Sequence, residues 1–349
     1  MMENVLTKLE HEITADILLN RPENEIVDNT VLVHNYLNSK DLNRQFLCGL
    51  ENRRLDVKLF YQGEQQAQNW INLCHSEEYC HYRNFLKFLK SIVLQLDEII
   101  QGDINLISLG IGDGEKEKVI LEQFLLNRQA GLFMVDASVD LIRSSLKNLA
   151  QLGVAKEAFV ADIVQHNVIK DIGCYAKKSN RDRINLYTFM GSTIGNVSQS
   201  AIFNILRETM KPGDYILIEF HVRSSDENYD SLGMVKEYGG DINRGIYFTL
   251  LEKSGITEDD GDVSVEYMRH HTLPFIDVIE IYFSFYKSKI VRFFGEELYF
   301  AGGEKILMES SCVYTIESVI HLLESYGMKV VKTFQDNSNH YLTTLCQMN

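Results

Sequence analysis

The stretch Asn105-Leu-Ile-Ser-Leu-Gly-Ile-Gly-Asp-Gly114 indicates the fold class of this 349-residue chain. Its first five residues form a short, largely apolar run, which is typical of a buried strand in a parallel sheet. The glycines that follow allow a tight turn and let the backbone approach a bound molecule without a clash at Cβ. A helix is expected from Glu115 onward. The stretch therefore predicts the strand, glycine loop and helix that begin a cofactor-binding α/β sheet.

The spacing of these glycines separates two classes of cofactor. A dinucleotide loop has the pattern G-x-G-x-x-G, whereas Gly110, Gly112 and Gly114 form G-x-G-x-G. The observed spacing suits S-adenosylmethionine, which has no pyrophosphate for the loop to bind. Asp136 ends the next apolar run and is suited to accept both ribose hydroxyls. Asp162 ends the run after that and is suited to accept the adenine amine. A plain tight turn and two helix caps are the alternative interpretation.

The pattern on either side of the loop completes the sheet. Apolar runs alternate with amphipathic segments, which predicts parallel strands with helices on both faces. We expect strands at 105–109, 132–135, 158–161, 184–190 and 215–220, and helices at 115–126, 139–149 and 198–210. A helix at 316–326 and a hairpin of 329–334 with 340–346 would close the domain. A terminal hairpin on a parallel sheet is characteristic of class I methyltransferases and not of dehydrogenases.

The rest of the chain is predicted to form a second lobe. The first 100 residues are expected to be mainly helical, with amphipathic helices at 4–19 and 83–100. Residues 224–315 interrupt the alternation and contain two β-prone runs, 278–285 and 289–294. We therefore expect an α+β substrate-binding lobe made of residues 1–85 and 224–315. The Rossmann-like cofactor domain would comprise residues 86–223 and 316–349.

Composition restricts the partners. The chain has 34 Lys and Arg against 49 Asp and Glu, a net charge of -15, so it should repel nucleic acid and act on a small molecule. The sequence shows no signal peptide and no apolar run of membrane-helix length, which predicts a cytoplasmic protein without a membrane partner. We also expect a monomer. Cys74-His75 and Cys80-His81 lack the spacing of zinc ligands, so no metal site is predicted.

Several motifs resemble those of a known family. Gly191-Ser-Thr-Ile-Gly-Asn196 follows the fourth strand, Lys211-Pro-Gly-Asp214 precedes the fifth, and Glu304-Lys-Ile-Leu-Met-Glu-Ser-Ser-Cys312 lies near the end. Lys58-Leu-Phe-Tyr61 and Glu78-Tyr79 add two early motifs at nearly the family's spacing. Together they resemble the histidine-specific Nα-methyltransferases, which make the histidine betaine used in ergothioneine synthesis. The resemblance runs from about residue 58 to the C-terminus.

The resemblance implies a role for each matching residue. The cofactor S-adenosylmethionine would be bound by the glycine loop and the residues that end the next two strands: Gly110, Gly112, Lys116, Asp136, Asp162 and Ile163. Asn196 and Tyr238 would hold the α-amino and α-carboxylate end of the acceptor and are the expected catalytic residues. Tyr79, Glu309 and Ser311 would recognise the imidazole.

The chemistry of these residue types agrees with the implied roles. A neutral imidazole presents one donor and one acceptor, so a carboxylate and a hydroxyl together can recognise both. Ordinary roles remain as alternatives: Tyr79 as a packing aromatic, Glu309 as a surface carboxylate, Ser311 as a helix N-cap, and Lys116 as an ion-pair partner on an exposed helix face. Two positions depart from the family. His221 replaces an acidic residue and inherits no role, and Ile281 replaces the methionine expected against the substrate ring.

The sequence thus predicts an S-adenosylmethionine-dependent N-methyltransferase that acts on the α-amine of a free amino acid, with L-histidine as the expected acceptor. The sulfonium already activates the methyl group, so the protein mainly needs to align the amine for in-line displacement. Another amino acid or a tryptophan-derived alkaloid precursor is the alternative acceptor, because the family includes fungal enzymes that methylate a prenylated tryptophan. A non-catalytic S-adenosylmethionine-binding protein is the alternative from another class.

Overall fold

A nine-stranded sheet with the order β1-β2-β5-β4-β3-β6-β7-β14-β13 forms the larger part of the protein. The computed structural model describes residues 23–27, 31–223, 231–269, 276–336 and 340–348. The strands are β1 (Glu23–Val27), β2 (Val31–Asn35), β3 (Ile104–Leu109), β4 (Ala130–Asp136), β5 (Ala155–Val160), β6 (Ile184–Phe189), β7 (Tyr215–His221), β13 (Met328–Gln335) and β14 (Tyr341–Met348). The six strands from β2 to β7 are parallel, and β14 joins β7 antiparallel before it pairs with β13. The predicted terminal hairpin is confirmed, and the sheet is that of a class I methyltransferase.

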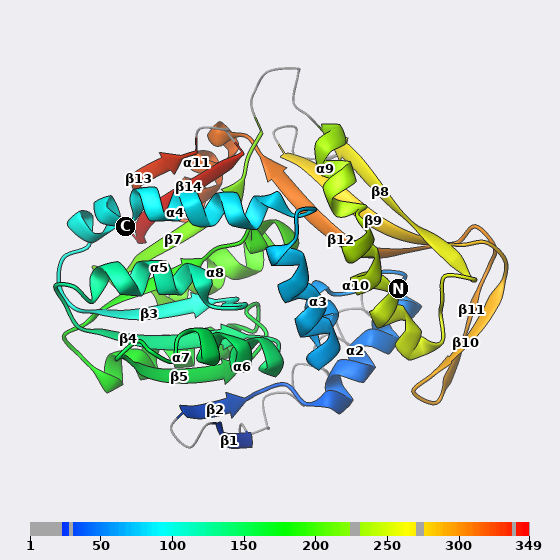
Figure 1. The fold of residues 1–349 in the computed structure, drawn as a ribbon, viewed down its shortest axis with the longest axis horizontal. Helices are drawn as coiled ribbons and strands as arrows, with labels where there is room; N and C mark the ends of the chain where they lie inside the picture. The colour runs from blue at the N-terminus through cyan, green and yellow to red at the C-terminus, as the bar shows by residue number, and fades with distance from the viewer. Residues whose placement is uncertain (1–22, 28–30, 224–230, 270–275, 337–339, 349) are drawn as a thin grey trace.

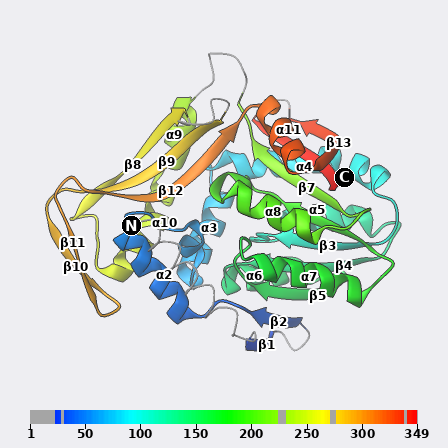
Figure 2. The same cartoon turned by 180° about the vertical axis from the view of Figure 1, so that it is seen from behind.

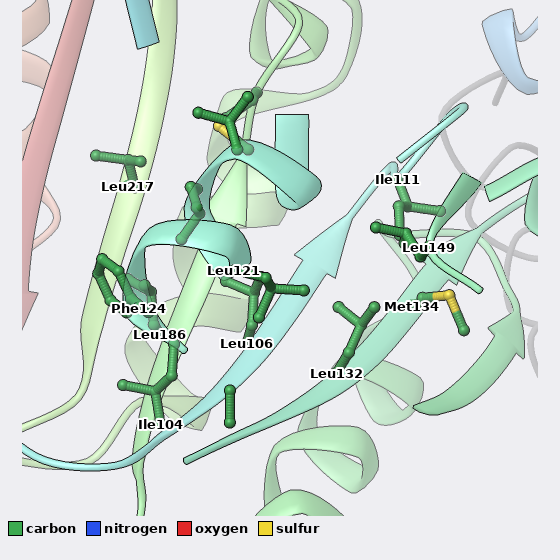
Figure 3. Close-up of a cluster of buried hydrophobic side chains, with 14 of the residues drawn as sticks. Ile104, Leu106, Ile111, Leu121, Phe124, Leu132, Met134, Leu149, Leu186 and Leu217 are labelled. Carbon is green, nitrogen blue, oxygen red and sulfur yellow. The ribbon is translucent and has the colours of Figure 1, made fainter. Parts of the chain in front are cut away.

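Helices cover both faces of this sheet (Figures 1 and 2). One face is covered by α4 (Cys80–Ile99), α5 (Glu115–Phe124) and α6 (Val139–Asn148), and the other by α7 (His166–Ser179), α8 (Gln199–Thr209) and α11 (Ile316–Ser325). Figure 3 shows the first interface, where Leu106 of β3 and Leu132 of β4 pack against Leu121 and Phe124 of α5. All four side chains are fully buried, which gives the cofactor loop above β3 a rigid base.

The second lobe has its own core. Its helices are α2 (Ser39–Glu51), α3 (Glu64–His75), α9 (Ser231–Tyr238) and α10 (Asp241–Leu251), with short 3-10 turns η1 (Val57–Tyr61) and η3 (Glu252–Ser254). A three-stranded antiparallel sheet consists of β12 (Lys305–Tyr314), β9 (Ile276–Phe285) and β8 (Gly261–Arg269), and β10 (Lys289–Phe293) pairs with β11 (Glu296–Phe300). In Figure 1 this lobe lies beside the ends of the parallel strands. Another 3-10 turn, η2 (Thr193–Asn196), follows β6 and packs against β12.

The structure adds several features that were not expected. The described part of the first 100 residues is mainly helical, as predicted, but β1 and β2 extend the main sheet, with Val33 opposite Ala158 of β5. This places residues 31–35 in the sheet rather than in the second lobe, because the otherwise open edge of β5 supplies a pairing partner that local sequence does not reveal. Helix α7 was not anticipated. The β-prone runs 278–285 and 289–294 are both strands, but they belong to different sheets. The expected helix at 4–19 lies outside the described residues.

Candidate active site

A cavity of about 890 Å³ lies at the carboxyl ends of the parallel strands, where the second lobe faces them. Ligands of open α/β sheets bind at this edge. The cavity is lined by ten of the residues expected at the site: Tyr79, Gly110, Gly112, Lys116, Asp136, Asp162, Ile163, Asn196, Tyr238 and Glu309. Residues that are more than 200 positions apart in the sequence thus meet around one space.

The glycine loop holds the Asp136 carboxylate in place. Gly110 and Gly112 have φ values of 80° and 60°, which favour glycine. The Gly112 N–H donates to one oxygen of Asp136 at 3.0 Å, and the Ser138 N–H donates to the other at 2.9 Å. Burial raises the pKa of Asp136, although these N–H groups oppose the shift. Each oxygen keeps a second lone pair, so the carboxylate fits a role as acceptor for two ribose hydroxyls.

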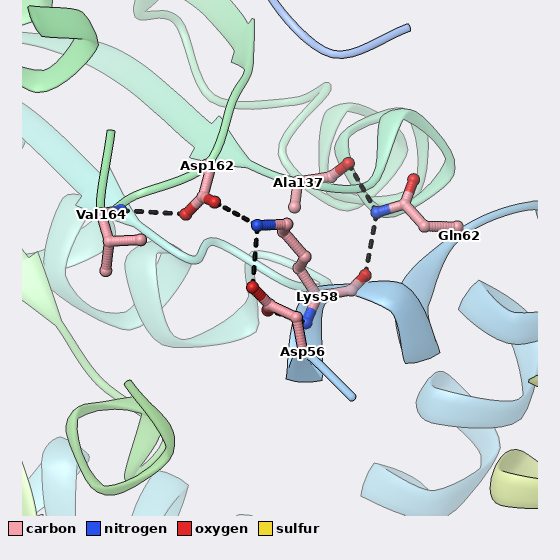
Figure 4. Close-up of polar contacts among 6 residues, drawn as sticks. All are labelled: Asp56, Lys58, Gln62, Ala137, Asp162 and Val164. Atoms are coloured by element: carbon pink, nitrogen blue, oxygen red, sulfur yellow. Dashed lines mark hydrogen bonds and ion pairs between the residues drawn. The ribbon is translucent and has the colours of Figure 1, made fainter. Parts of the chain in front are cut away.

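Asp162 is tied to the second lobe by a buried lysine. Figure 4 shows Lys58 of η1 between Asp162 and Asp56, while Gln62 bridges the carbonyls of Ala137 and Lys58. Burial opposes the charge on Lys58, but the two carboxylates outweigh it and raise its pKa to about 12. Asp162, the acid expected to bind the adenine, therefore lies two residues beyond β5 and pairs with a lysine to which the sequence analysis assigned no role.

Lys116 is buried and faces the cavity. Its Nζ lies 5.3 Å from the centre of the Tyr82 ring, and a Cβ on Gly191 would approach it to 3.1 Å. Burial alone would lower the pKa of Lys116, but Glu117 and Asp113 outweigh this and raise it. The alternative of an ion pair on an exposed helix face is wrong. A buried ammonium that lines the cavity is suited to bind the carboxylate of a methionine moiety.

On the acceptor side, Asn196 and Glu309 are joined directly. The Asn196 Nδ2 donates to Glu309 Oε1 at 3.0 Å, and the Tyr247 hydroxyl donates to Glu309 Oε2 at 2.9 Å. Burial raises the pKa of Glu309 to about 7, and the bond from Tyr247 opposes the shift. Asn196 Oδ1 is buried without a protein partner. Because an orphaned buried acceptor is costly, this oxygen is suited to receive an N–H from a ligand.

A β-bulge determines the face of β12 on which Glu309 lies. The pairing of β12 with β9 shifts between Leu307 and Glu309, so that Glu309 lies opposite Ile281 and Leu307 opposite Tyr282. In a regular strand Glu309 would share the face of Leu307. The extra residue, Met308, instead places Glu309 on the other face. Ile281 is fully buried below it and does not line the cavity.

Tyr238, Ser311 and Tyr79 are the other residues expected to contact the methyl acceptor, and they differ in how they lie relative to the cavity. The Tyr238 hydroxyl donates to the Ser311 Oγ at 3.2 Å. Ser311 is buried and does not itself line the cavity, so any effect on a ligand would pass through Tyr238. Tyr79 stacks on His81 with ring centres 5.5 Å apart and lies 6.1 Å from the Trp70 ring. The helix that follows β12 is capped by Thr315, so Ser311 is not its N-cap.

Sequence reasoning missed several cavity residues. Lys58 and Tyr61 belong to an early motif whose resemblance carried no assigned role, and Trp70, His81 and Glu237 lie on helices with no distinguishing pattern. Within the described ranges, no group of three or more His, Cys, Asp or Glu side chains is arranged to hold a metal ion. The described helices are also all too short or too polar to span a bilayer.

Several known proteins are similar to this chain. The histidine N-alpha-methyltransferase of Mycolicibacterium smegmatis is 24% identical over 251 residues, which cover 69% of this chain and 74% of that protein. A solved S-adenosylmethionine-dependent methyltransferase from Clostridium acetobutylicum is 12% identical, with a TM-score of 0.41 over 75% of this chain and 92% of its own. An amino pentose methyltransferase from Micromonospora echinaspora is 11% identical, with a TM-score of 0.37 over 77% and 95%. The family model for the S-adenosylmethionine-dependent, histidine-specific methyltransferases matches residues 42–231 and 258–348. Because this match extends over most of the sequence, the chain belongs to that family and uses S-adenosylmethionine as its methyl donor.

Proposed function

We propose that this methyltransferase transfers the methyl group to the α-amine of free L-histidine. The observation that carries the proposal is the pairing of Asn196 with Glu309 in one cavity. The unpartnered Oδ1 of Asn196 would accept an N–H from the amine, while Glu309 would accept the imidazole N–H. The amine and the imidazole of histidine lie only a few bonds apart, so neighbouring acceptors suit this amino acid. A free amino acid acceptor also agrees with the acidic net charge of the chain.

The residues of the chain would act mainly by alignment. S-adenosylmethionine supplies a methyl group that is activated by the positive sulfur. Asn196 and Tyr238 would fix the α-carbon end of the acceptor so that the nitrogen lone pair points along the line of displacement. Tyr238 is itself supported by Ser311. Asp136, Asp162 and Lys116 would hold the cofactor from the opposite side of the cavity. Repeated methylation, up to a trimethylammonium product, requires no further group.

The indole of a tryptophan-derived acceptor has a donor but no acceptor atom in its ring. Glu309 would still accept its N–H, but the indole offers no ring acceptor to the hydroxyl of Tyr79, which also lines the cavity. Histidine therefore fits the described side chains better.

Two measurements test the proposal. Mass spectrometry of products from a pooled amino-acid mixture with labelled cofactor should show label on histidine, and the mass gain gives the number of methyl groups. Calorimetry with adenosylhomocysteine present should show histidine binding at least tenfold more tightly than the other amino acids. Equal binding of all amino acids would contradict the histidine assignment and leave the family membership intact.

A further inference from the structure

A cluster of buried histidines and glutamates lies beside the acceptor part of the cavity. It comprises His81 of α4, Glu219 and His221 of β7, and Glu237 of α9. His81, Glu219 and Glu237 line the cavity, and Glu237 directly precedes the acceptor residue Tyr238. None of these four side chains has a part in the alignment described above. The cluster is therefore a set of titratable groups in contact with the reaction space but without an assigned task.

His81 connects this cluster to the loop that carries Asn196. Its Nε2 lies 3.1 Å from the Ser192 Oγ and 3.5 Å from Glu219 Oε1. Glu219 is fully buried and also accepts the Gly191 N–H at 2.5 Å. The His81 ring is thus held by the first residues of the Gly191–Asn196 segment, while it stacks on Tyr79 on its other side.

Glu237 is the acid of the cluster with a free acceptor. Its Oε1 is buried without a hydrogen-bond partner. Burial raises the pKa of Glu237, while His81 and His340 favour its charged form and oppose the shift. A carboxylate with a raised pKa and an open lone pair at a cavity wall is a stronger base than an exposed glutamate.

The groups that face this cluster come from several elements. They are Lys116 of α5, Ser192 before η2, Asp336 after β13, His340 before β14 and Tyr341 at the start of β14. The rings of His81 and His221 are 5.1 Å apart, and burial together with His81 and His340 holds the pKa of His221 well below its usual value. His340 is half-buried, so the cluster extends from the cavity to the surface.

The acceptor must lose a proton before it can attack. An α-amine has a pKa of about 8 in peptides, so the acceptor arrives largely as an ammonium ion at neutral pH. We propose that Glu237, which lines the cavity with an unpartnered buried oxygen, accepts this proton. This inference rests on the proposed transfer to an amine. The N–H bond breaks and the proton moves to the Glu237 carboxylate. The amine then forms the N–C bond while the C–S bond breaks, and the bonding pair stays on sulfur.

Each round of methylation gives a new ammonium ion that still carries a proton until the nitrogen has three methyl groups. Glu237 must therefore return to its charged form between rounds. The Glu237 carboxylate accepts the His81 backbone N–H, and His81 favours the charged form of Glu237. Glu237 would be the catalytic base, and His81 would be a positioning residue that acts through it.

Steady-state kinetics over pH 6–10 with Glu237→Gln tests this assignment. We expect kcat to fall about 100-fold at pH 7, with the deficit shrinking above the pKa of the ammonium, because the acceptor then arrives uncharged. Glu237→Asp keeps a carboxylate and should retain the wild-type shape of the pH profile. Asp241→Asn, an exposed acid of the next helix, is the matched control and should leave the profile unchanged. Circular dichroism verifies that each variant is folded.

His81→Gln gives an independent readout. The amide keeps a partner for Ser192 but carries no charge, so the positive neighbour that favours the Glu237 carboxylate is lost. The acid limb of the kcat profile should shift to higher pH. Histidine methylation with unchanged profiles in both variants, or a loss of rate that is the same at every pH, would overturn the assignment of Glu237 as the base alone. Failure of the wild-type protein to methylate any amino acid would instead overturn the proposed function and this inference with it.

Discussion

At the scale of single residues, Glu309 combines the strongest geometric and electrostatic signals on the acceptor side. It receives two hydrogen bonds and has a pKa raised by burial to about 7. Its carboxylate keeps free lone pairs for an imidazole N–H. The recognition of a ring donor would weaken if that carboxylate became an amide, because only one of the two acceptor oxygens would remain and the negative charge would be lost.

Glu309→Gln should therefore weaken histidine binding at least tenfold, which corresponds to about 1.4 kcal/mol or more. The affinity for adenosylhomocysteine should stay within about twofold, since Glu309 lies on the acceptor side. Calorimetry measures both. Glu296→Gln, an exposed acid of β11, is the control and should change neither. Equal loss of both affinities would mean that Glu309 supports the whole cavity and does not recognise the ring.

Lys58 is the corresponding residue on the cofactor side. Lys58→Met keeps much of the aliphatic length but removes the charge that pairs with Asp162 and Asp56. Breaking a buried pair leaves an uncompensated carboxylate, so we expect a five- to twentyfold loss of S-adenosylmethionine affinity. Lys87→Met on the exposed face of α4 is the control. Unchanged cofactor affinity with a lower melting temperature would assign Lys58 a structural role only.

At the scale of elements, the contact of η2 with β12 sets the distance between Asn196 and Glu309. Gly195 lies so close to β12 that a Cβ would be 2.8 Å from the Cys312 carbonyl oxygen and 3.2 Å from the Ser311 Oγ. This explains in physical terms why the second glycine of the Gly191–Asn196 motif is needed. A side chain there must push η2 away from the strand.

Gly195→Ala should lower the free energy of unfolding by about 1–3 kcal/mol through overpacking. It should also reduce histidine affinity more than cofactor affinity, because Asn196 moves with η2. Gly245→Ala is the matched control: a Cβ there meets nothing within 4 Å, and alanine favours the helix. Chemical denaturation and calorimetry compare the two variants. Equal behaviour of both would show that the η2 contact is adaptable.

At the scale of the whole molecule, the alternation of apolar runs and helices was sufficient to predict the cofactor sheet and its terminal hairpin. The central strands are continuous apolar runs because both of their faces are buried, and the helices between them are amphipathic. The same signal did not reveal that β2 pairs with β5, since a five-residue strand carries little periodicity. The bulge at Met308 was also not predicted, because one extra residue in a strand does not change the local composition detectably. The motif residues were sufficient to predict where the cavity lies. The cavity residues on α3, α4 and α10 were not predicted, because only tertiary packing brings them to the cavity.

The acid with the raised pKa also predicts how the stability of the ligand-free protein depends on pH. The pKa of Glu309 is about 7 in the folded protein against 4.5 for the unperturbed group. The folded state therefore binds this proton more tightly, and the stabilisation is fully present below about pH 4.5 and lost as pH rises through 7. Groups with lowered pKa values, such as Asp260 and Glu304, act in the opposite sense and destabilise only when pH falls through their own range.

Glu309→Gln isolates this contribution. Any fixed cost of placing an amide opposite Asn196 and Tyr247 is the same at every pH, so the change with pH is the informative quantity. The free energy of unfolding of the variant, relative to wild type, should rise by on the order of 2 kcal/mol between pH 5 and pH 8. Urea denaturation of the ligand-free proteins measures it, with Glu296→Gln expected to give a flat difference. If the difference in free energy of unfolding between Glu309→Gln and wild type is also independent of pH, the Glu309 carboxylate ionises in its ordinary range and its burial does not raise its pKa.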